Sequence, residues 1–159
     1  MKSAVIIADD LTGACDSGVQ MLHKGHAVRV LIDVTACRGL KADQECIAAV
    51  SMDTRSINSA MAYQKVRETA SVLRGNGFVW FYKKVDSLLR GNAGREIEAM
   101  LDELHYDAAV IVPAFPACGR SVLNGCVHVA DGGDGVRFSA IAAVRQTSEG
   151  PCGSIGLPT

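Results

Sequence analysis

Residues 4–10 read Ala-Val-Ile-Ile-Ala-Asp-Asp, a short apolar run that stops at two aspartates. Continuous runs of this length, rich in β-branched residues, are typical of parallel strands that helices cover on both faces. After the run, Thr12 can cap a helix that begins near Gly13, and Gly25 can end it. Asp16 would then lie in the first turn of that helix. The run therefore predicts the first strand and helix of an α/β protein.

Strands and helices continue to alternate further along the chain. Short apolar runs predict the strands, and apolar residues at helical spacing predict the helices. The predicted strands cover 27–32, 46–51, 78–82 and 108–112, the predicted helices cover 56–74 and the segment after Asn92, and 35–45 is polar and irregular. Strands that alternate with crossover helices predict a doubly wound, mainly parallel sheet with flanking helices, here as an incomplete domain.

The composition changes from Asp131 onward. Gly132, Gly133 and Gly135 come close together, lysine is absent and no hydrophobic period survives. We therefore divide the chain into a domain over 1–129 and a divergent tail over 130–159, which we expect to be loop-rich or disordered. A frameshift or a truncated gene would produce such a tail.

The overall composition excludes several classes of protein. The chain has 159 residues, of which 48% are hydrophobic and 21% charged. Lys+Arg number 16 and Asp+Glu 17, so the formal charge of -1 offers no attraction for nucleic acid or an anionic membrane. No apolar run approaches the roughly 18 residues of a membrane span, and the N-terminus does not resemble a signal peptide. We expect a cytoplasmic protein that binds neither nucleic acid nor membrane.

Several chemical motifs are also absent from the sequence. There is no G-x-G-x-x-G, no Walker A loop, no G-x-S-x-G elbow and no H-E-x-x-H. The adjacent Asp9 and Asp10 differ from the D-x-D of phosphatases, because neighbouring residues of an extended chain point in opposite directions. The six cysteines have no C-x-x-C spacing, which favours reduced thiols over a metal site or disulfides. The sequence thus predicts neither an ATP site nor a metal site.

Polar clusters follow four of the predicted strands, at the edge of the sheet where ligands of such folds bind. They are 9–10, 53–55, 83–87 and the residues after Pro113. Arg55 could bind a carboxylate through two hydrogen bonds, with Lys84 and Arg90 adding positive charge. Asp10 or Asp86 could accept hydrogen bonds from hydroxyls, whereas we expect Lys83 and Arg95 to lie on solvated faces. The clusters suit a small, hydroxylated, anionic ligand.

Four blocks of the sequence, in this order, resemble the four-carbon acid sugar kinases. They read IADDLTGACDSG from Ile7, DTR from Asp53, KKVDSLLRGN from Lys83 and PAFPACGR from Pro113, the last followed by Asn124-Gly125. The resemblance covers residues 1–129, the N-terminal domain of that family. It implies a substrate-binding part of an ATP-dependent kinase that phosphorylates threonate, erythronate or 3-oxo-tetronate. In such enzymes a C-terminal domain, absent from this sequence, holds ATP and Mg²⁺.

The resemblance also implies roles for individual residues. Asp10 or Asp86 would orient the hydroxyl or take its proton, and Arg55 and Lys84 would bind the sugar acid's carboxylate. Asn92 has a second interpretation, as the cap of its helix. The substrate-binding candidates are Asp9, Asp10, Arg55, Lys84, Asp86, Ser87, Arg90 and Asn92.

Alternative functions remain open. The chain could be a non-catalytic sugar-acid binding module or a decayed remnant of such a kinase, and we expect it to be inactive alone. A less favoured hypothesis is an unrelated α/β hydrolase or phosphatase that uses Asp9 or Asp10. Strands missing after Val129 would leave a sheet edge uncovered, which predicts self-association, including a homo-oligomer.

Overall fold

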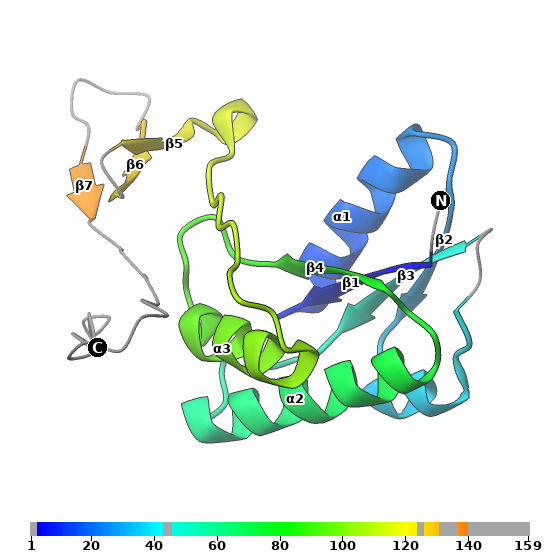
Figure 1. Ribbon diagram of the computed structural model, residues 1–159. Coiled ribbons are helices and arrows are strands. Elements are labelled where there is room, and N and C mark those ends of the chain that lie inside the picture. The colour runs from blue at the N-terminus through cyan, green and yellow to red at the C-terminus, as the bar shows by residue number, and fades with distance from the viewer. Residues whose placement is uncertain (1–2, 43–45, 124–125, 131–136, 140–159) are drawn as a thin grey trace. The chain divides into compact units, whose positions relative to one another are not determined.

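The computed structural model describes residues 3–42, 46–123, 126–130 and 137–139. The chain forms two compact units (Figure 1). The first comprises Met1–Asp86 and Arg90–Tyr106, and the second comprises Ser87–Leu89 and Asp107–Thr159. Within the described ranges, no helix has the length and apolar character needed to cross a membrane. Most of the predicted tail over 130–159 lies outside the described residues.

The first unit contains a four-stranded sheet in which every pair of neighbours is parallel. Its strands are β1 (Ala4–Ala8), β2 (Ala27–Leu31), β3 (Cys46–Ser51) and β4 (Trp80–Lys84), in the order β2-β3-β1-β4. The strand β3 has the predicted bounds, whereas β4 begins and ends two residues later than predicted. The prediction of a mainly parallel α/β sheet is therefore confirmed.

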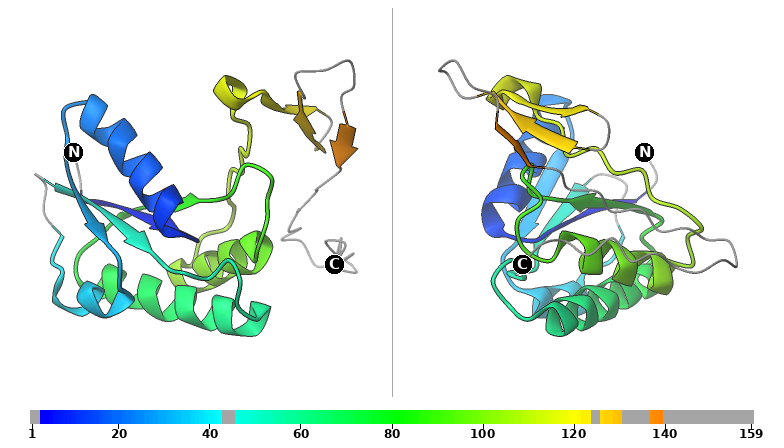
Figure 2. Two further views of the ribbon diagram at one scale, coloured as in Figure 1. Left: turned by 180° about the vertical axis from the view of Figure 1, so that it is seen from behind. Right: turned by 90° about the vertical axis from the view of Figure 1, so that its left-hand side faces the viewer.

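Helices cover both faces of this sheet. Helix α1 (Leu11–His23) lies on one face, and α2 (Ser59–Gly75) and α3 (Ala93–Leu104) lie together on the other (Figures 1 and 2). Ile6 and Ile47 belong to the core beneath α1, while Val5 and Val50 belong to the larger core beneath α2 and α3. Because side chains alternate between the two faces of each strand, the strands contribute residues to two separate apolar layers.

The arrangement creates a topological switch point between β1 and β3. These strands are neighbours, but the chain leaves β1 for α1 on one face and leaves β3 for α2 on the opposite face. Ligands of open α/β sheets bind outside the carboxyl ends of strands at such a point. Residues that follow β1 and β3 are therefore the first candidates for a functional site.

The start of α1 differs from the prediction. The helix begins at Leu11, and its cap is Asp10, whose Oδ1 accepts a hydrogen bond of 2.7 Å from the backbone N–H of Gly13. Thr12 and Asp16 therefore have neither the capping nor the first-turn role predicted for them. Helix α1 ends at His23, and Gly25 follows with a φ of +83°, a conformation that glycine adopts without strain.

The second unit is mainly an antiparallel sheet. It contains the 3₁₀ turn η2 (Pro116–Cys118) and the strands β5 (Arg120–Leu123), β6 (Cys126–Val129) and β7 (Arg137–Ser139), in the order β5-β6-β7. Strand β7 falls in the part predicted as a tail. In the first unit, the irregular segment 35–45 contains a second 3₁₀ turn, η1 (Val34–Gly39).

The predicted strand over 108–112 is wrong, because this segment has no regular secondary structure. Val110 is 94% exposed and Val112 is 70% exposed. An apolar, β-branched run favours a strand only when a neighbouring backbone accepts and donates its hydrogen bonds, and the described residues give this segment no such pairing. The local sequence therefore does not predict the structure of this segment, because a strand also requires a neighbouring strand to pair with.

Candidate functional site

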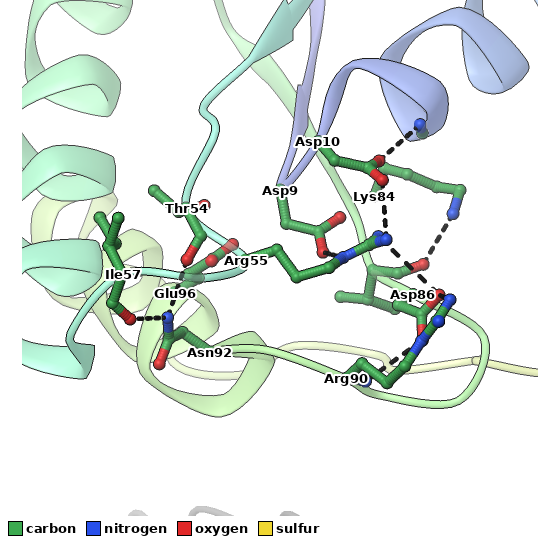
Figure 3. Close-up of polar contacts among 12 residues, drawn as sticks. Asp9, Asp10, Thr54, Arg55, Ile57, Lys84, Asp86, Arg90, Asn92 and Glu96 are labelled. Atoms are coloured by element: carbon green, nitrogen blue, oxygen red, sulfur yellow. Dashed lines mark hydrogen bonds and ion pairs between the residues drawn. The ribbon is translucent and has the colours of Figure 1, made fainter.

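Three of the four predicted polar clusters meet at the carboxyl ends of β1, β3 and β4. The backbone pairing continues beyond the strands, since the N–H of Met52 donates to the carbonyl of Ala8 and that of Thr54 to the carbonyl of Asp9, both at 2.9 Å. This pairing brings Arg55 beside the two aspartates that follow β1 (Figure 3). The fourth cluster, after Pro113, belongs to the second unit.

Arg55 lies among three carboxylates. Its Nε is 2.8 Å from Asp9 Oδ2, its Nη1 is 2.7 Å from Asp10 Oδ2, and its Nη2 is 3.8 Å from Asp86 Oδ1. The hydrogen bond to Asp9, followed by the negative charges of the three carboxylates, raises the pKa of Arg55 above its ordinary value. Because each guanidinium nitrogen already faces a carboxylate of this chain, direct contact of Arg55 with a ligand carboxylate stays a prediction.

The two aspartates after β1 have different surroundings. The side chain of Asp9 is 4% exposed, and its Oδ1 is buried without a hydrogen-bond partner among the described residues. Asp10 is more accessible and has two partners, because Oδ1 caps α1 and Oδ2 faces Arg55. Asp10 therefore links the orientation of a helix to the charge cluster.

Asp86 and Arg90 form a fork-shaped ion pair within the loop after β4. Arg90 Nε is 2.8 Å from Asp86 Oδ2, and Nη2 is 2.8 Å from Oδ1. The hydrogen bond to Asp86 raises the pKa of Arg90 above its ordinary value. Asp86 is buried while the Arg90 side chain is 59% exposed, so the pair presents its positive partner to solvent.

Lys84 ends β4 close to the start of α1. Its Nζ donates a hydrogen bond of 2.7 Å to the carbonyl of Val85. A Cβ on Gly13 would lie 3.2 Å from Lys84 Cγ and 2.9 Å from Asp10 Oδ1. Glycine at position 13 therefore allows helix α1, Lys84 and Asp10 to approach one another.

Unusual backbone conformations occur next to these side chains. Gly91 has a φ of +80°, and a Cβ there would lie 3.0 Å from the carbonyl oxygen of Arg55. Asp53 and Leu89 adopt left-handed conformations with φ of 48° and 55°. Residues with side chains seldom adopt this region, and such positions cluster at functional sites.

Asn92 is the N-cap residue of α3, but its side chain does not cap the helix. Its side chain makes no capping hydrogen bond; instead Nδ2 donates to the carbonyls of Thr54 at 2.8 Å and Ile57 at 2.9 Å. The predicted N-cap position is therefore confirmed, whereas the side-chain hydrogen bond of a cap is not formed. Asn92 attaches the start of α3 to the loop that carries Arg55.

Ser87 belongs to the second unit, with Leu88 and Leu89. Its hydroxyl accepts a hydrogen bond from Arg120 Nη1, another residue of that unit. The structure therefore shows a partner for Ser87 within its own unit, and its contact with a ligand stays a prediction.

Sequence reasoning missed a buried ion pair. Lys83, expected on a solvated face, has a side chain that is 8% exposed and lies 2.6 Å from Oε2 of Glu96, which is fully buried. The expectation for Arg95 is confirmed, because its side chain is 47% exposed and pairs with Glu98. One signal for Glu96 was available: it stands one turn before Met100 on the apolar face of α3, where a lone charge needs a partner.

The described residues contain no group of three or more histidine, cysteine or acidic side chains that could hold a metal ion. The side chains that meet at the edge of the sheet are charged. Aspartate oxygens can accept hydrogen bonds from hydroxyls, and lysine and arginine can attract an anion.

An open parallel sheet with a charged cluster at its switch point defines an α/β ligand-binding domain. The chain belongs to the family of sugar-binding N-terminal domains, which it matches over residues 4–148. The resemblance to the four-carbon acid sugar kinases is confirmed by its relatives. It is 40% identical to the D-erythronate kinase of Heliobacterium modesticaldum over 130 residues, which are 81% of this chain and 30% of that protein.

Other relatives have related activities. The D-threonate kinase of Bordetella bronchiseptica is 40% identical over 79% of this chain and 32% of its own length. The 3-oxo-tetronate kinase of Haemophilus influenzae is 34% identical over 79% of this chain and 31% of its own length. This chain thus spans about a third of the length of the curated relatives it matches.

A solved structure has the same fold. A crystal structure from Bordetella bronchiseptica, described as a domain of unknown function, is 36% identical with a TM-score of 0.74 over 81% of this chain and 33% of that chain. It is a domain-swapped dimer with bound citrate.

Proposed function

We propose that this chain is the sugar-acid-binding part of an ATP-dependent kinase that phosphorylates a four-carbon acid such as D-threonate, D-erythronate or 3-oxo-tetronate. The observation that carries the proposal is the charge cluster at the switch point, where Arg55 gathers Asp9, Asp10 and Asp86. The names of the relatives support this class of substrate. Citrate, also a hydroxylated acid, is bound in the related crystal structure.

In this proposal the carboxylates recognise the hydroxyls of the sugar acid. Asp10 is the more accessible of the two catalytic candidates, and Asp86 is held in place by Arg90. One of them orients the hydroxyl that is phosphorylated and accepts its proton as the oxygen attacks the γ-phosphorus of ATP, whose bond to the departing ADP breaks. Arg55, which is paired with Asp9, keeps the carboxylates of Asp10 and Asp86 in position.

Lys84 is the preferred contact for the carboxylate of the sugar acid. A lysine ammonium has three donors, and the described residues show one bond from Lys84 Nζ, to the carbonyl of Val85. Arg90, whose side chain is largely exposed, adds positive charge at the same edge. Arg55 contributes its charge, and Asn92 attaches the start of α3 to the loop that carries Arg55.

ATP and Mg²⁺ are bound, in this proposal, by a separate nucleotide-binding domain. The absence of known nucleotide-binding motifs from the sequence and the greater length of the relatives support that division. The chain alone would then bind the sugar acid without kinase activity. A non-catalytic binding module is accordingly the second candidate function. The free thiols of Cys15, Cys37, Cys46 and Cys118 favour a reducing, cytoplasmic setting, and the dimeric relative favours a homo-oligomer.

Calorimetric titration of the 159-residue chain with D-threonate and D-erythronate tests the proposal. Asp10→Asn should bind more weakly by about 1.5–3 kcal/mol, because a charged acceptor is lost, while asparagine still caps α1 and preserves folding. Arg95→Ala, on the exposed side of α3, is the matched control and should bind normally. Absence of binding to every four-carbon acid would refute the proposal, and ATP turnover by the chain alone would refute the assignment as a non-catalytic module.

A further inference from the structure

We infer that Lys83 and Glu96 form a buried positioning pair that fixes the two ends of the site loop, defined as residues 85–86 and 90–92 of the first unit, and thereby the charge cluster. The expected effect of this pair on ligand binding rests on the proposed function, whereas its expected effect on the structure of the loop does not. Lys83 Nζ lies 2.6 Å from Glu96 Oε2, and the side chains are 8% and 0% exposed. The pair therefore joins the end of β4, just before the site loop, to the first turns of α3, just after it.

Stability alone does not account for this pair. Transfer of two charges out of water carries a desolvation penalty, and replacement of buried ion pairs by apolar residues of similar size is often neutral or stabilising. The pair is also incompletely satisfied, because both carboxylate oxygens of Glu96 are buried without a hydrogen-bond partner among the described residues, so that Oε2 has its ion contact with Lys83 alone. A pair of this kind specifies geometry more than it adds free energy of folding.

At the start of the loop, Lys83 fixes Lys84. The Nζ of Lys83 donates a hydrogen bond of 2.9 Å to the backbone carbonyl of Lys84 while it also contacts Glu96. Successive residues of a strand point to opposite faces, so Lys83 faces α3 while Lys84 lies against Gly13 at the start of α1. Anchoring Lys83 to α3 therefore sets the position from which Lys84 reaches the site.

At the end of the loop, Glu96 is coupled to the residues that contact Arg55. The backbone N–H of Glu96 donates to the carbonyl of Asn92 at 2.9 Å, and the Asn92 side chain donates to the carbonyl of Thr54. Gly91, one residue earlier, packs directly against Arg55. The contact between Lys83 and Glu96 thus closes a ring that holds both ends of the site loop.

A double variant, Lys83→Met with Glu96→Leu, separates positioning from stability, because it removes both charges and keeps apolar volume. We expect it to unfold cooperatively at a temperature close to that of the parent chain. Its affinity for D-threonate should fall at least about tenfold, since the groups that contact the ligand are no longer held in place. Hydrogen exchange of the site-loop amides should be faster by about tenfold, with exchange in β1 and α2 unchanged.

The matched control is Arg95→Met with Glu98→Leu, an exposed ion pair on the same helix. This control should leave both affinity and site-loop exchange unchanged. If the Lys83 and Glu96 double variant does not fold, Glu96→Asp replaces it, because both charges remain while the carboxylate is withdrawn by one methylene. Faster exchange confined to the site loop is expected there too.

The exchange measurement decides the inference independently of the proposed function. Unchanged exchange in the site loop, or acceleration equal to that of β1 and α2, would overturn it. If the parent chain binds no four-carbon acid while the double variant still loosens the site loop, the proposed function fails and the positioning pair stands. If binding occurs and both variants bind like the parent, the pair has no role in the site.

Discussion

Arg55 Nε lies 2.8 Å from Oδ2 of the buried Asp9, and this contact joins the residues that follow β3 to those that follow β1. The same guanidinium faces Asp10 and Asp86, which come from a helix cap and from the loop after β4. Without Arg55, the negative charges of these three carboxylates would repel one another more strongly at this edge of the sheet. The site therefore depends on a cation supplied by the protein itself.

Arg55→Met should reduce the free energy of unfolding by about 3–5 kcal/mol, because the buried Asp9 would lose its partner. Urea unfolding measures the loss. Arg95→Met is the control, because Arg95 and its partner Glu98 are both exposed, and it should lose only about 0–1 kcal/mol. Equal losses for the two variants would contradict the central position of Arg55.

Asn92→Asp should destabilise the protein as much as Asn92→Ala, by about 1–3 kcal/mol. Aspartate is a good helix cap, but it cannot donate the two hydrogen bonds that Asn92 makes to the carbonyls of Thr54 and Ile57. Chemical unfolding of the two variants measures the difference. A stable Asn92→Asp protein would restore the capping role that the sequence suggested.

Glu103 should make stability depend on pH in acid. A hydrogen bond from Ser71, followed by contacts with Arg67 and Arg74, lowers its pKa below the ordinary 4.5. A depressed carboxyl pKa contributes stability above the unfolded value, and this contribution is lost as pH falls through the folded value. The stability difference between the parent and Glu103→Gln should therefore shrink as pH falls from about 6 to about 3. Parallel pH profiles would show that Glu103 is not responsible.

Cys37 should resist alkylation in the folded protein. Burial, with a smaller effect of the Asp33 charge, raises the pKa of Cys37 to about 11, and the thiolate is the reactive form. Cys15 and Cys118 are exposed, so an alkylating reagent can reach them and should label them in the folded protein. Mass spectrometry of digested protein locates the label. Labelling of Cys37 at the rate of Cys15 before denaturant is added would contradict its burial.

The sheet could be predicted from the sequence because its strands are continuous apolar runs. Cys46 to Ser51 forms a strand with the predicted bounds, and Ala4 to Ala8 forms the one that precedes the two aspartates. The gathering of Asp10, Arg55 and Lys84 at one edge follows from parallel topology alone, since all strands then end on the same side.

Pairings between distant residues could not be predicted in the same way. The direction of Lys83 depends on the register of β4, and its partner Glu96 lies further along the chain, on α3. The segment 108–112 shows the opposite error, because its β-branched residues favour a strand that the described structure does not form. Both cases depend on tertiary contacts, which local patterns do not contain.

Asp53 and Leu89 have left-handed backbone conformations, and in the sequence they come just before Arg55 and Arg90. A side chain in this conformation costs about 1–2 kcal/mol relative to glycine, so glycine at either position would relieve local strain. A laboratory selection for heat resistance would therefore recover glycine at these two positions early. Such variants would melt at a higher temperature but would hold the neighbouring Arg55 and Arg90 less firmly. Selection for thermal stability and selection for ligand recognition would therefore favour different residues at these two positions.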